Sequence, residues 1–466
     1  MIRRGTPLNI LVIAALVVVG VAASWVALAA IRSGGVSIAT PLRGEDLGHR
    51  VLVIAPHPDD ESLATGGTIH NLIASGAQVK VVIVTAGDSY RSAAQRISGG
   101  TADKSAYLRL GEVRHQESLA AAARLGLPAT DVISLGYTDG VTSSMWDRSW
   151  DTSAPVTGRA GVKAVPYSWA FSQGVAQCGQ DVATDLESVI KGFRPDTIIT
   201  SDVYETHPDH ATVAAFASYA MDDVGFTGRR LSYVVHFRHY PYPWGNLPAT
   251  ALNPPPQLVS SDTAWFAFPL DASDLEAKTA AVDEYASQSE IADMGLYMRA
   301  LIRANELFAS RTVPRLVSLG TDARPVAGQA TTVAVTPPPV VAPAPGSTRP
   351  RVAAMLMARG PKTLWIGLPC DAQIATGSTF RVDLRLFGGG APSRLDVAVR
   401  GTAASVLTVA SDSVTPSGVR AEVDGNTVWI AVPADVLAGR TRCMIGAMGG
   451  TANASPVPTA WRDVAL

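Results

Sequence analysis

Two short histidine motifs contain the residues of this chain that are best suited to chemistry. The first is His57-Pro58-Asp59-Asp60-Glu61 and the second is His207-Pro208-Asp209-His210. Each motif follows a segment with the pattern of a buried strand and precedes one with helical periodicity. The chain holds 8 His and 31 Pro among 466 residues, so two His-Pro-Asp copies would arise by chance in on the order of one such chain in a thousand. The repeat therefore indicates shared chemistry.

The residue types of these motifs fit a mononuclear metal hydrolase. Zinc takes imidazole nitrogen and carboxylate oxygen as ligands, and a catalytic zinc site keeps one position open. A further carboxylate beside the ligands can accept a proton from water that the cation acidifies. Proline after each histidine fixes the turn and begins the helix without wasting an amide donor. The alternative is that these residues only cap helices, because Asp is common at helix starts.

The elements that must position the motifs alternate between strands and helices, which is typical of a mainly parallel sheet covered by helices. Both motifs then lie at the carboxyl ends of strands, where an open α/β sheet binds its ligand. We predict strands at 50–55, 79–84, 132–135, 197–200 and 232–237, and helices at 63–75, 107–125, 182–191, 208–221, 274–285 and 291–308.

Composition divides the remainder of the chain. A stretch rich in Pro, Ala, Val and Thr cannot form a core and predicts a linker. Beyond it, apolar residues recur at a two-residue period and Asp424-Gly425 has the sequence of a hairpin turn, so we expect an antiparallel β-sandwich. The predicted domains are 1–34 (cytoplasmic tip and transmembrane anchor), 35–322 (catalytic), 323–350 (linker) and 351–466 (accessory β-sandwich).

An uncharged run from Ile10 to Ile31 predicts a membrane-spanning helix, because its 22 residues would extend roughly 33 Å. Arg3 and Arg4 precede the run, which predicts an amino terminus in the cytoplasm and a body outside it. The predicted localisation is the cell membrane, single-pass, with an extracytoplasmic catalytic domain. Cleavage after Ala27-Leu28-Ala29 and secretion is the alternative.

Several classes of protein are excluded or disfavoured. A formal net charge of −2 gives no reason to propose a nucleic-acid partner. The chain has neither the Gly-x-Gly-x-x-Gly spacing of a dinucleotide site nor a Gly-x-Ser-x-Gly elbow. Three cysteines without Cys-x-x-Cys spacing are too few for a disulfide framework. A bond between Cys370 and Cys443 is permitted outside the cytoplasm, and two unpaired thiols are the alternative.

Over residues 50–308 the sequence resembles the LmbE-like, or PIG-L, metal-dependent de-N-acetylases, which remove acetyl groups from N-acetylglucosamine-containing substrates. The two histidine motifs are the main basis of the resemblance. The immediate residue before His57 departs from the family pattern, because it is Pro56 rather than alanine. Weaker support comes from Gly66-Gly67, Val84-Thr85-Ala86-Gly87-Asp88, Glu117, Leu135-Gly136-Tyr137 with Asp139, Ser287-Gln288 and Asn305-Glu306-Leu307-Phe308.

The resemblance implies a Rossmann-like catalytic domain and a role for each motif residue. Asp59 would be the general base, and His207 would polarise the amide carbonyl or protonate the leaving amine. Asp209 would orient His207 or a neighbouring ligand. The implied metal ligands are His57, Asp60 and His210. The metal would be Zn²⁺, with Fe²⁺ as an alternative.

Aromatic residues suggest where a sugar would bind. The segment 140–174 is long and loop-like, and such loops are usually functional or disordered. Trp146 and Trp169 in it, and Trp244 further along, are predicted to contact a glycan, with packing alone as the alternative. Asp88 and Asp139 complete the predicted substrate-binding residues. His236 and His239 lie in an aromatic stretch, where one of them could line the pocket, but packing is the expectation for both.

The predicted function is that of a zinc-dependent hydrolase that removes the N-acetyl group from an N-acetylglucosamine-bearing glycan, glycolipid or glycoside outside the cytoplasm. Its partners would be an N-acetylated amino-sugar substrate and, through the first helix, the membrane. One alternative is a metal-dependent amidase of a sugar–thiol conjugate. The other is a non-catalytic surface glycan-binding protein, although a pure binder would have no need of Asp59.

Overall fold

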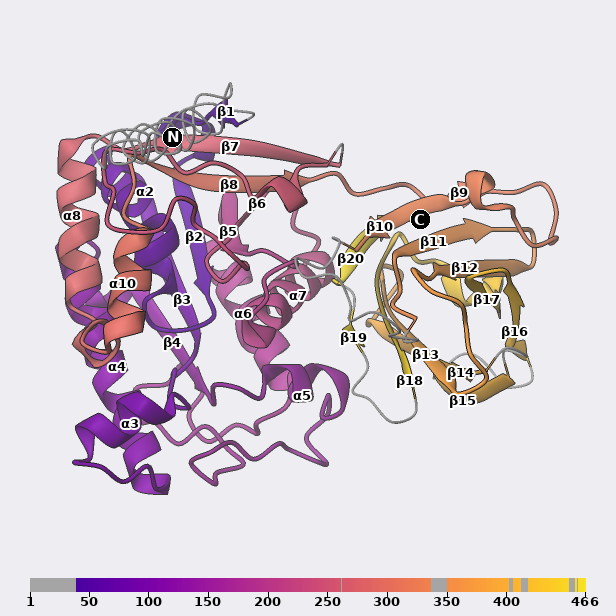
Figure 1. The fold of residues 1–466 in the computed structure, drawn as a ribbon, viewed down its shortest axis with the longest axis horizontal. Helices are drawn as coiled ribbons and strands as arrows, with labels where there is room; N and C mark the ends of the chain where they lie inside the picture. The colour runs from indigo at the N-terminus through magenta and orange to yellow at the C-terminus, as the bar shows by residue number, and fades with distance from the viewer. Residues whose placement is uncertain are drawn as a thin grey trace, which may run out of the picture.

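A computed structural model of the protein describes residues 39–260, 262–336, 350–401, 405–411, 418–451, 457–458 and 460–466. These residues form a larger α/β unit and a smaller β unit that lie side by side (Figure 1). The predicted anchor at 10–31 and the run of three prolines at 337–339 lie outside the described residues.

An eight-stranded sheet in the order β1-β7-β8-β6-β5-β2-β3-β4 forms the centre of the larger unit. The five strands from β6 to β4 are parallel to one another, whereas β8 is antiparallel to both β6 and β7. The strands are β1 (Thr40–Pro41), β2 (Arg50–Ala55), β3 (Gln78–Thr85), β4 (Val132–Tyr137), β5 (Thr197–Ser201), β6 (Arg229–Tyr233), β7 (Thr263–Pro269) and β8 (Asn305–Arg311). The sheet is thus mixed: it contains the mainly parallel arrangement that was predicted, and β8 adds two antiparallel pairings to it.

Helices cover both faces of this sheet (Figure 1). Side chains of β2 alternate between the faces: Val51 and Val53 pack with α2, α4 and α8, while Leu52 and Ile54 pack with α6 and α7. All four are buried, as expected for a strand covered on both sides. The helices are α2 (Asp60–Ala74), α3 (Arg91–Ile97), α4 (Lys104–Arg124), α5 (Thr142–Asp147), α6 (Gly179–Phe193), α7 (Pro208–Asp223), α8 (Ala272–Asp283), α9 (Ala286–Ser289) and α10 (Ala292–Ala300).

One predicted helix, 291–308, is wrong in its second half. The structure ends α10 at Ala300 and places β8 at Asn305–Arg311. A short apolar run such as Leu307 and Phe308 is compatible with a helix or with a strand. Here the segment is a strand because it pairs with β7. Within β8, Glu306 is fully buried and forms an ion pair of 2.6 Å with Lys278. That partner comes from another element, so the local sequence does not reveal it.

Two six-stranded sheets make up the β unit. One has the order β10-β11-β12-β17-β16 with β9 beside β11, and the other has the order β15-β14-β13-β18-β19 with β20 beside β18. Ile366, Leu384 and Ile445 lie in the buried core between them. The strands are β9 (Val317–Ser318), β10 (Thr331–Val335), β11 (Ala354–Arg359), β12 (Thr363–Pro369), β13 (Ser378–Phe387), β14 (Ser393–Arg400), β15 (Ser405–Ser411), β16 (Arg420–Asp424), β17 (Thr427–Pro433), β18 (Arg442–Thr451), β19 (Val457–Pro458) and β20 (Arg462–Ala465).

The β unit begins before the predicted boundary at residue 351, because it includes β9 and β10. Strand β9 pairs in parallel with β11, and β10 pairs with β11 in the antiparallel direction. Strand β10 lies within the segment predicted as a linker. Its β-branched residues suit a strand, and Val333 is buried in the core of the β unit.

The predicted fold class included a transmembrane helix, and the predicted localisation was a single-pass membrane protein with its catalytic domain outside the cytoplasm. In the part of the chain that the structure describes, no helix is long and apolar enough to cross a bilayer. The run at 10–31, on which both predictions rested, lies outside that part. Both predictions are therefore corrected, and the described fold is an α/β unit with a mixed sheet joined to a β unit.

The three cysteines are all buried and free. Cys370 follows β12 and Cys443 lies in β18, so the two residues belong to different sheets. Of the two alternatives left open by the sequence, the structure shows the unpaired thiols.

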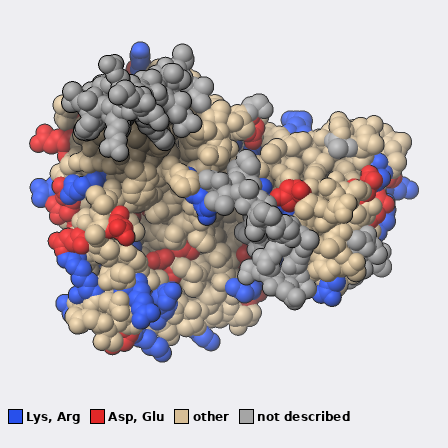
Figure 2. Space-filling model, in the orientation of Figure 1, with Lys and Arg blue, Asp and Glu red and all other residues tan. Residues whose placement is uncertain are grey.

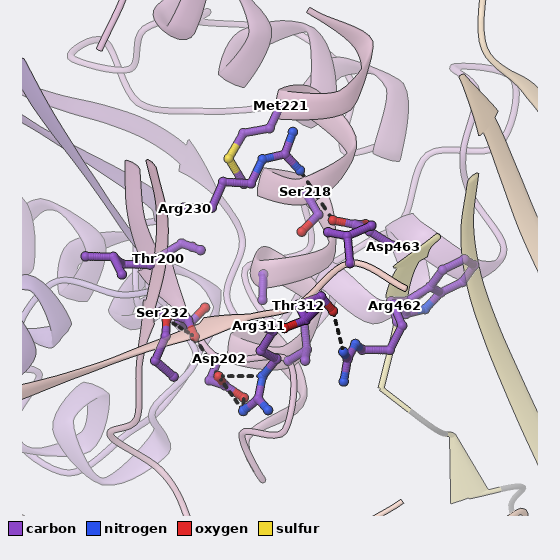
Figure 3. A pocket seen from close by; sticks show the side chains of 17 residues that line it. Thr200, Asp202, Ser218, Met221, Arg230, Ser232, Arg311, Thr312, Arg462 and Asp463 are labelled. Atoms are coloured by element: carbon purple, nitrogen blue, oxygen red, sulfur yellow. Dashed lines mark hydrogen bonds and ion pairs between the residues drawn. The ribbon is translucent and has the colours of Figure 1, made fainter. Parts of the chain in front are cut away.

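Charged side chains of both signs lie beside the junction of the two units (Figure 2). Asp222 of α7 accepts from Arg230 of the α/β unit and from Arg442 of the β unit, each at 2.8 Å. Arg230 also contacts Asp463 of β20 at 3.3 Å. Figure 3 shows Arg230 and Asp463 at a cavity of about 100 Å³ between the units. Ion pairs around the buried Asp222 carboxylate, made with partly exposed arginines, therefore hold the β unit to the α/β unit.

Candidate active site

Loops at the carboxyl ends of the parallel strands bring the two histidine motifs together. His57 follows β2, Asp139 follows β4, and His207 immediately precedes α7 after β5. Strand β2 lies between β3 and β5, so the chain leaves β2 toward one side and returns later on the other. Such a reversal of strand order is the place where open α/β sheets bind ligands.

The first motif forms a strained turn. Asp59 has a φ of 118°, a conformation that costs a non-glycine residue free energy and is found mainly at functional sites. The backbone N–H of His57 donates to Asp60 Oδ2 at 2.9 Å, and that of Asp59 donates to Glu61 Oε2 at 3.2 Å. These two bonds from the start of α2 hold the turn. The second motif has Pro208 in the first turn of α7, where a missing N–H costs nothing.

Three side-chain atoms of the motifs lie close together. His57 Nδ1 is 3.1 Å from His210 Nε2 and 3.3 Å from Asp60 Oδ2, and His210 Nε2 is 3.1 Å from the same oxygen. Ligands of a tetrahedral zinc with bonds of about 2.0–2.1 Å are about 3.3 Å apart. The spacing of these atoms therefore fits a single cation, although their assignment as ligands stays a prediction.

The electrostatics of the site also fit a cation. Burial alone would lower the pKa of His57, but Asp139, Asp209 and Asp60 raise it well above its ordinary value. For His210 burial is likewise outweighed by carboxylates, first by Asp60, and the pKa is raised to about 9. Asp60 Oδ1 and His210 Nδ1 are buried and have no hydrogen-bond partner in the part of the chain that the structure describes. An excess of buried carboxylate around two imidazoles calls for positive charge at this point.

Further donors surround these three residues. Three sets have ligand atoms within 4.8 Å of one another: His57 with His207 and His210, Asp60 with His210 and His236, and His57 with Asp139 and Asp209. The ring of His236 also stacks on Tyr297 with centroids 5.2 Å apart. His236 therefore packs, as the sequence suggested, but it also reaches the metal-ligating groups. The sequence allowed one of His236 and His239 a place at the pocket, and His236 does line the cavity.

Asp59 is held by an arginine that the sequence did not reveal. Arg114 of α4 donates to Asp59 Oδ2 at 2.9 Å, and both side chains are buried. Burial raises the pKa of Asp59 to about 8, and the guanidinium of Arg114 opposes that rise. A cation bound beside it would lower this pKa further. A single arginine in a helical segment does not indicate, from sequence alone, that it contacts Asp59.

His207 lies at the cavity among other imidazoles. Burial, and then His57 and His210, lower the pKa of His207 to about 4, so its ring is neutral near pH 7. Its Nδ1 atom has no hydrogen-bond partner among the described residues. A neutral imidazole can donate one N–H to a bound substrate.

Asp209 connects the second motif to the first. One carboxylate oxygen lies 3.2 Å from His57 Nε2 and accepts from the Gly140 N–H at 2.6 Å. The other accepts from the Thr142 hydroxyl at 2.5 Å. Asp209 thus contacts a histidine of the site and the start of α5, and its role in orienting a ligand stays a prediction.

A cavity of about 260 Å³ opens over these groups. Of the predicted substrate residues, Asp139 lines it and also lies 3.3 Å from His57 Nε2. Asp88 is buried beneath it, where it accepts from Tyr167 and from the Asp139 N–H, each at 3.0 Å. The cavity is lined by His57, Asp59, Leu63, Ser89, Tyr90, Arg114, Asp139, Gly140, Arg159, His207, His236, Gln288, Met294 and Tyr297.

The structure does not bring the three predicted tryptophans to this cavity. Trp146 is 1% exposed and packs against Trp150 and Trp461. The Trp169 ring lies between Tyr167 and His115. Trp244 is 52% exposed and lies near Tyr297. Trp146 and Trp169 thus pack against other rings, which is the alternative that the sequence left open.

Fold and site together define an α/β protein with a cluster of imidazoles and carboxylates at its strand ends that could hold a metal ion, and with a buried carboxylate, Asp59, beside it. Residues 52–221 match the family described as PIG-L: GlcNAc-PI de-N-acetylase. The chain therefore carries a PIG-L, or LmbE-like, domain, as its resemblance indicated.

Relatives of this chain include proteins described as "1D-myo-inositol 2-acetamido-2-deoxy-alpha-D-glucopyranoside deacetylase". The one from Tsukamurella paurometabola is 29% identical over 181 residues, which are 38% of this chain and 57% of that protein. The one from Mycobacterium sp. (strain KMS) is 28% identical over 280 residues, which are 58% and 82%. A solved structure described as the zinc inhibited form of teicoplanin deacetylase Orf2 has a TM-score of 0.35 and 22% identity, and the match covers 56% of this chain and 98% of that one.

Proposed function

We propose that the α/β unit is a metal-dependent hydrolase that removes the N-acetyl group from an N-acetylglucosamine-containing substrate. The observation that carries the proposal is the convergence of His57, Asp60 and His210 within 3.3 Å of one another, with Asp59 lining the same cavity. Membership of residues 52–221 in the PIG-L family and the deacetylase descriptions of the relatives support it.

The proposed metal ligands are His57, Asp60 and His210. Two nitrogens and one carboxylate oxygen suit Zn²⁺, and the same set suits Fe²⁺. When bound, such a cation supplies a Lewis acid and lowers the pKa of water to about 7. We propose zinc.

The residues of the chain do the rest of the chemistry. Asp59, held by Arg114, takes a proton from the attacking water as the new carbon–oxygen bond forms. His207 donates an N–H to the acetyl oxygen and stabilises the charge that develops there. The carbon–nitrogen bond then breaks, and the proton held by Asp59 passes to the leaving nitrogen. The products are the free amine and acetate.

The test is release of acetate, and for the sugar–thiol amide release of the free amino sugar, by the purified full chain, each measured after chelation and again after adding zinc. The substrates are 1D-myo-inositol 2-acetamido-2-deoxy-α-D-glucopyranoside, N-acetylglucosamine, a simple N-acetylglucosaminide and a sugar–thiol amide. We expect zinc-dependent acetate from at least one N-acetylated sugar. No acetate from any of them, with zinc bound, would contradict the proposal, and cleavage of the sugar–thiol amide alone would replace it with an amidase.

A further inference from the structure

Arginines of the β unit contact the end of helix α5. Arg385 of β13 donates to the Trp146 carbonyl at 3.4 Å, and Arg394 of β14 donates to the Asp147 carbonyl at 3.2 Å. Arg381, also on β13, donates to the Asp147 carbonyl at 3.5 Å. The last carbonyls of a helix have no partner within the helix. The β unit therefore supplies the donors that end α5.

Arg385 is the most enclosed of the three arginines. Its side chain is 2% exposed. The guanidinium carbon lies 5.3 Å from the ring centroids of Trp146, Trp150 and Trp461. Two of these rings come from the α/β unit and Trp461 comes from the end of the chain. Aromatic rings on several sides restrict a guanidinium more than one surface ion pair does, so Arg385 fixes α5 against β13.

The other end of α5 touches the candidate active site. The Gly140 N–H and the Thr142 hydroxyl both donate to Asp209, at 2.6 and 2.5 Å. Asp209 in turn lies 3.2 Å from His57 Nε2. Helix α5 spans only Thr142–Asp147, so a single short helix separates the contact with the β unit from the contact with Asp209.

We propose that Arg385 is a positioning residue, through which the β unit holds α5 and thereby keeps Asp209 against His57 in the orientation that metal binding needs. This inference rests on the proposed function, because it concerns the same metal site. It assigns to the β unit a direct part in building that site. Partners of metal-ligating histidines fix the ring orientation, and their loss typically lowers metal affinity about 10–100-fold.

A second contact of the β unit reaches the other ligand-bearing loop. Arg462 of β20 donates to the Tyr204 hydroxyl at 3.1 Å. The next residue, Glu205, has a carboxylate oxygen 3.6 Å from His210 Nδ1. The β unit thus contacts the segments that support both histidines of the site, which a tethered accessory module would not need to do.

The test compares Arg385→Met and Arg385→Lys with Arg420→Met in the full chain. Arg420 lies 5.2 Å over Trp365 in the other sheet of the β unit, so it is a matched arginine–tryptophan contact that is remote from α5. The readouts are zinc affinity by competition with a chelator, the visible absorption spectrum of the Co²⁺-loaded protein, and the melting temperature. We expect Arg385→Met to bind zinc about 10–100-fold more weakly and to alter the Co²⁺ spectrum, Arg385→Lys to restore part of the affinity, and Arg420→Met to match wild type.

Thr142→Val supplies an independent variant from the far end of α5, because it removes the hydroxyl donated to Asp209 and leaves Arg385 intact. It should change the Co²⁺ spectrum in the same way, and the double variant should lose less zinc affinity than the sum of the two single losses. If Arg385→Met fails to fold, the zinc affinity and the Co²⁺ spectrum of Arg385→Lys and Thr142→Val test the inference instead.

Wild-type zinc affinity and Co²⁺ spectra in Arg385→Lys and Thr142→Val, or in Arg385→Met with only its melting temperature lowered, would overturn the inference. The proposed function fails in a different way. A wild-type protein that binds zinc but releases no acetate would remove the deacetylase proposal, while the effects of the variants on metal affinity would still support the role of Arg385.

Discussion

His57 Nδ1 lies 3.1 Å from His210 Nε2, although 153 residues separate the two along the chain. Two imidazole nitrogens at that distance must share a proton or bind a common cation. Asp60 Oδ2 lies within 3.3 Å of both nitrogens, which provides a third ligand atom and a negative charge. A shared divalent cation would bind all three of these atoms at once.

Replacing one ligand should abolish metal binding. We expect His210→Ala to retain no zinc after dialysis. It should release acetate on the order of 10³-fold more slowly, because the bound cation would lower the activation free energy by several kcal/mol. Zinc content by elemental analysis and acetate release measure the two effects. His49→Ala, which changes an exposed histidine outside the site, is the control. A His210→Ala protein that held one zinc per chain would remove this residue from the ligand set.

Replacing the proposed base should separate turnover from metal binding. Asp59→Asn keeps the shape of the side chain but cannot accept a proton from water, so kcat should fall on the order of 10²–10⁴-fold. Zinc content and KM should stay near wild type, since Asp59 is not among the proposed ligands. Near-normal kcat in this variant would assign the base to another residue.

Removing the metal should lower stability. A ligand that binds only the folded state stabilises it by about 4 kcal/mol at a thousandfold excess over Kd. For a chain of this size that corresponds to a fall in Tm of about 4–7 °C on chelation. Thermal unfolding with and without chelator measures the change in wild type and in His210→Ala. An equal fall in both proteins would show that the stabilising ion lies elsewhere.

The parts of the site that could be predicted from sequence are those that repeat or that follow the general rule for strand ends. Two His-Pro-Asp motifs, each after a buried strand, predicted that His57 and His210 would converge. Arg114 could not be found in this way, and for His236 the sequence allowed a place at the pocket but favoured packing. Each is a single residue of its kind on its element, and its contact with the site depends on how α4 and the loop after β6 pack.

In the fold, too, the elements with a clear local pattern could be predicted, and those that depend on packing could not. Strand β2 is buried on both faces and was recognised with its correct bounds, since its apolar run is unbroken. Strand β8 was predicted as part of a helix, because its identity depends on pairing with β7 and on the buried pair of Glu306 with Lys278. The role of Trp146 could not be foreseen either, since its partner Arg385 belongs to the other unit.

The junction of the two units should make stability depend on pH. Burial, and then the charge of Asp222, raise the pKa of Asp463 to about 7, against the opposing effect of Arg230 and Arg442. Asp463 and Arg230 face each other in Figure 3. The unfolded chain ionises this carboxyl near pH 4, so between about pH 4 and pH 7 the folded state holds a proton that the unfolded state has released. The stabilising contribution of Asp463 is therefore fully present below pH 4 and is lost as pH rises through 7.

Between pH 5 and pH 7.5 we expect Asp463→Asn to reduce this loss by at most about 3 kcal/mol, since about two pK units lie between pH 5 and the folded pKa of about 7, at 1.36 kcal/mol each. Urea unfolding at pH 5 and at pH 7.5 gives the free energy of unfolding of wild type and variant at each pH. Asp435→Asn, which changes an exposed carboxylate of the β unit, should leave the pH dependence unchanged. If wild type and Asp463→Asn lost the same free energy of unfolding between the two pH values, Asp463 would be ionised in the folded protein at both.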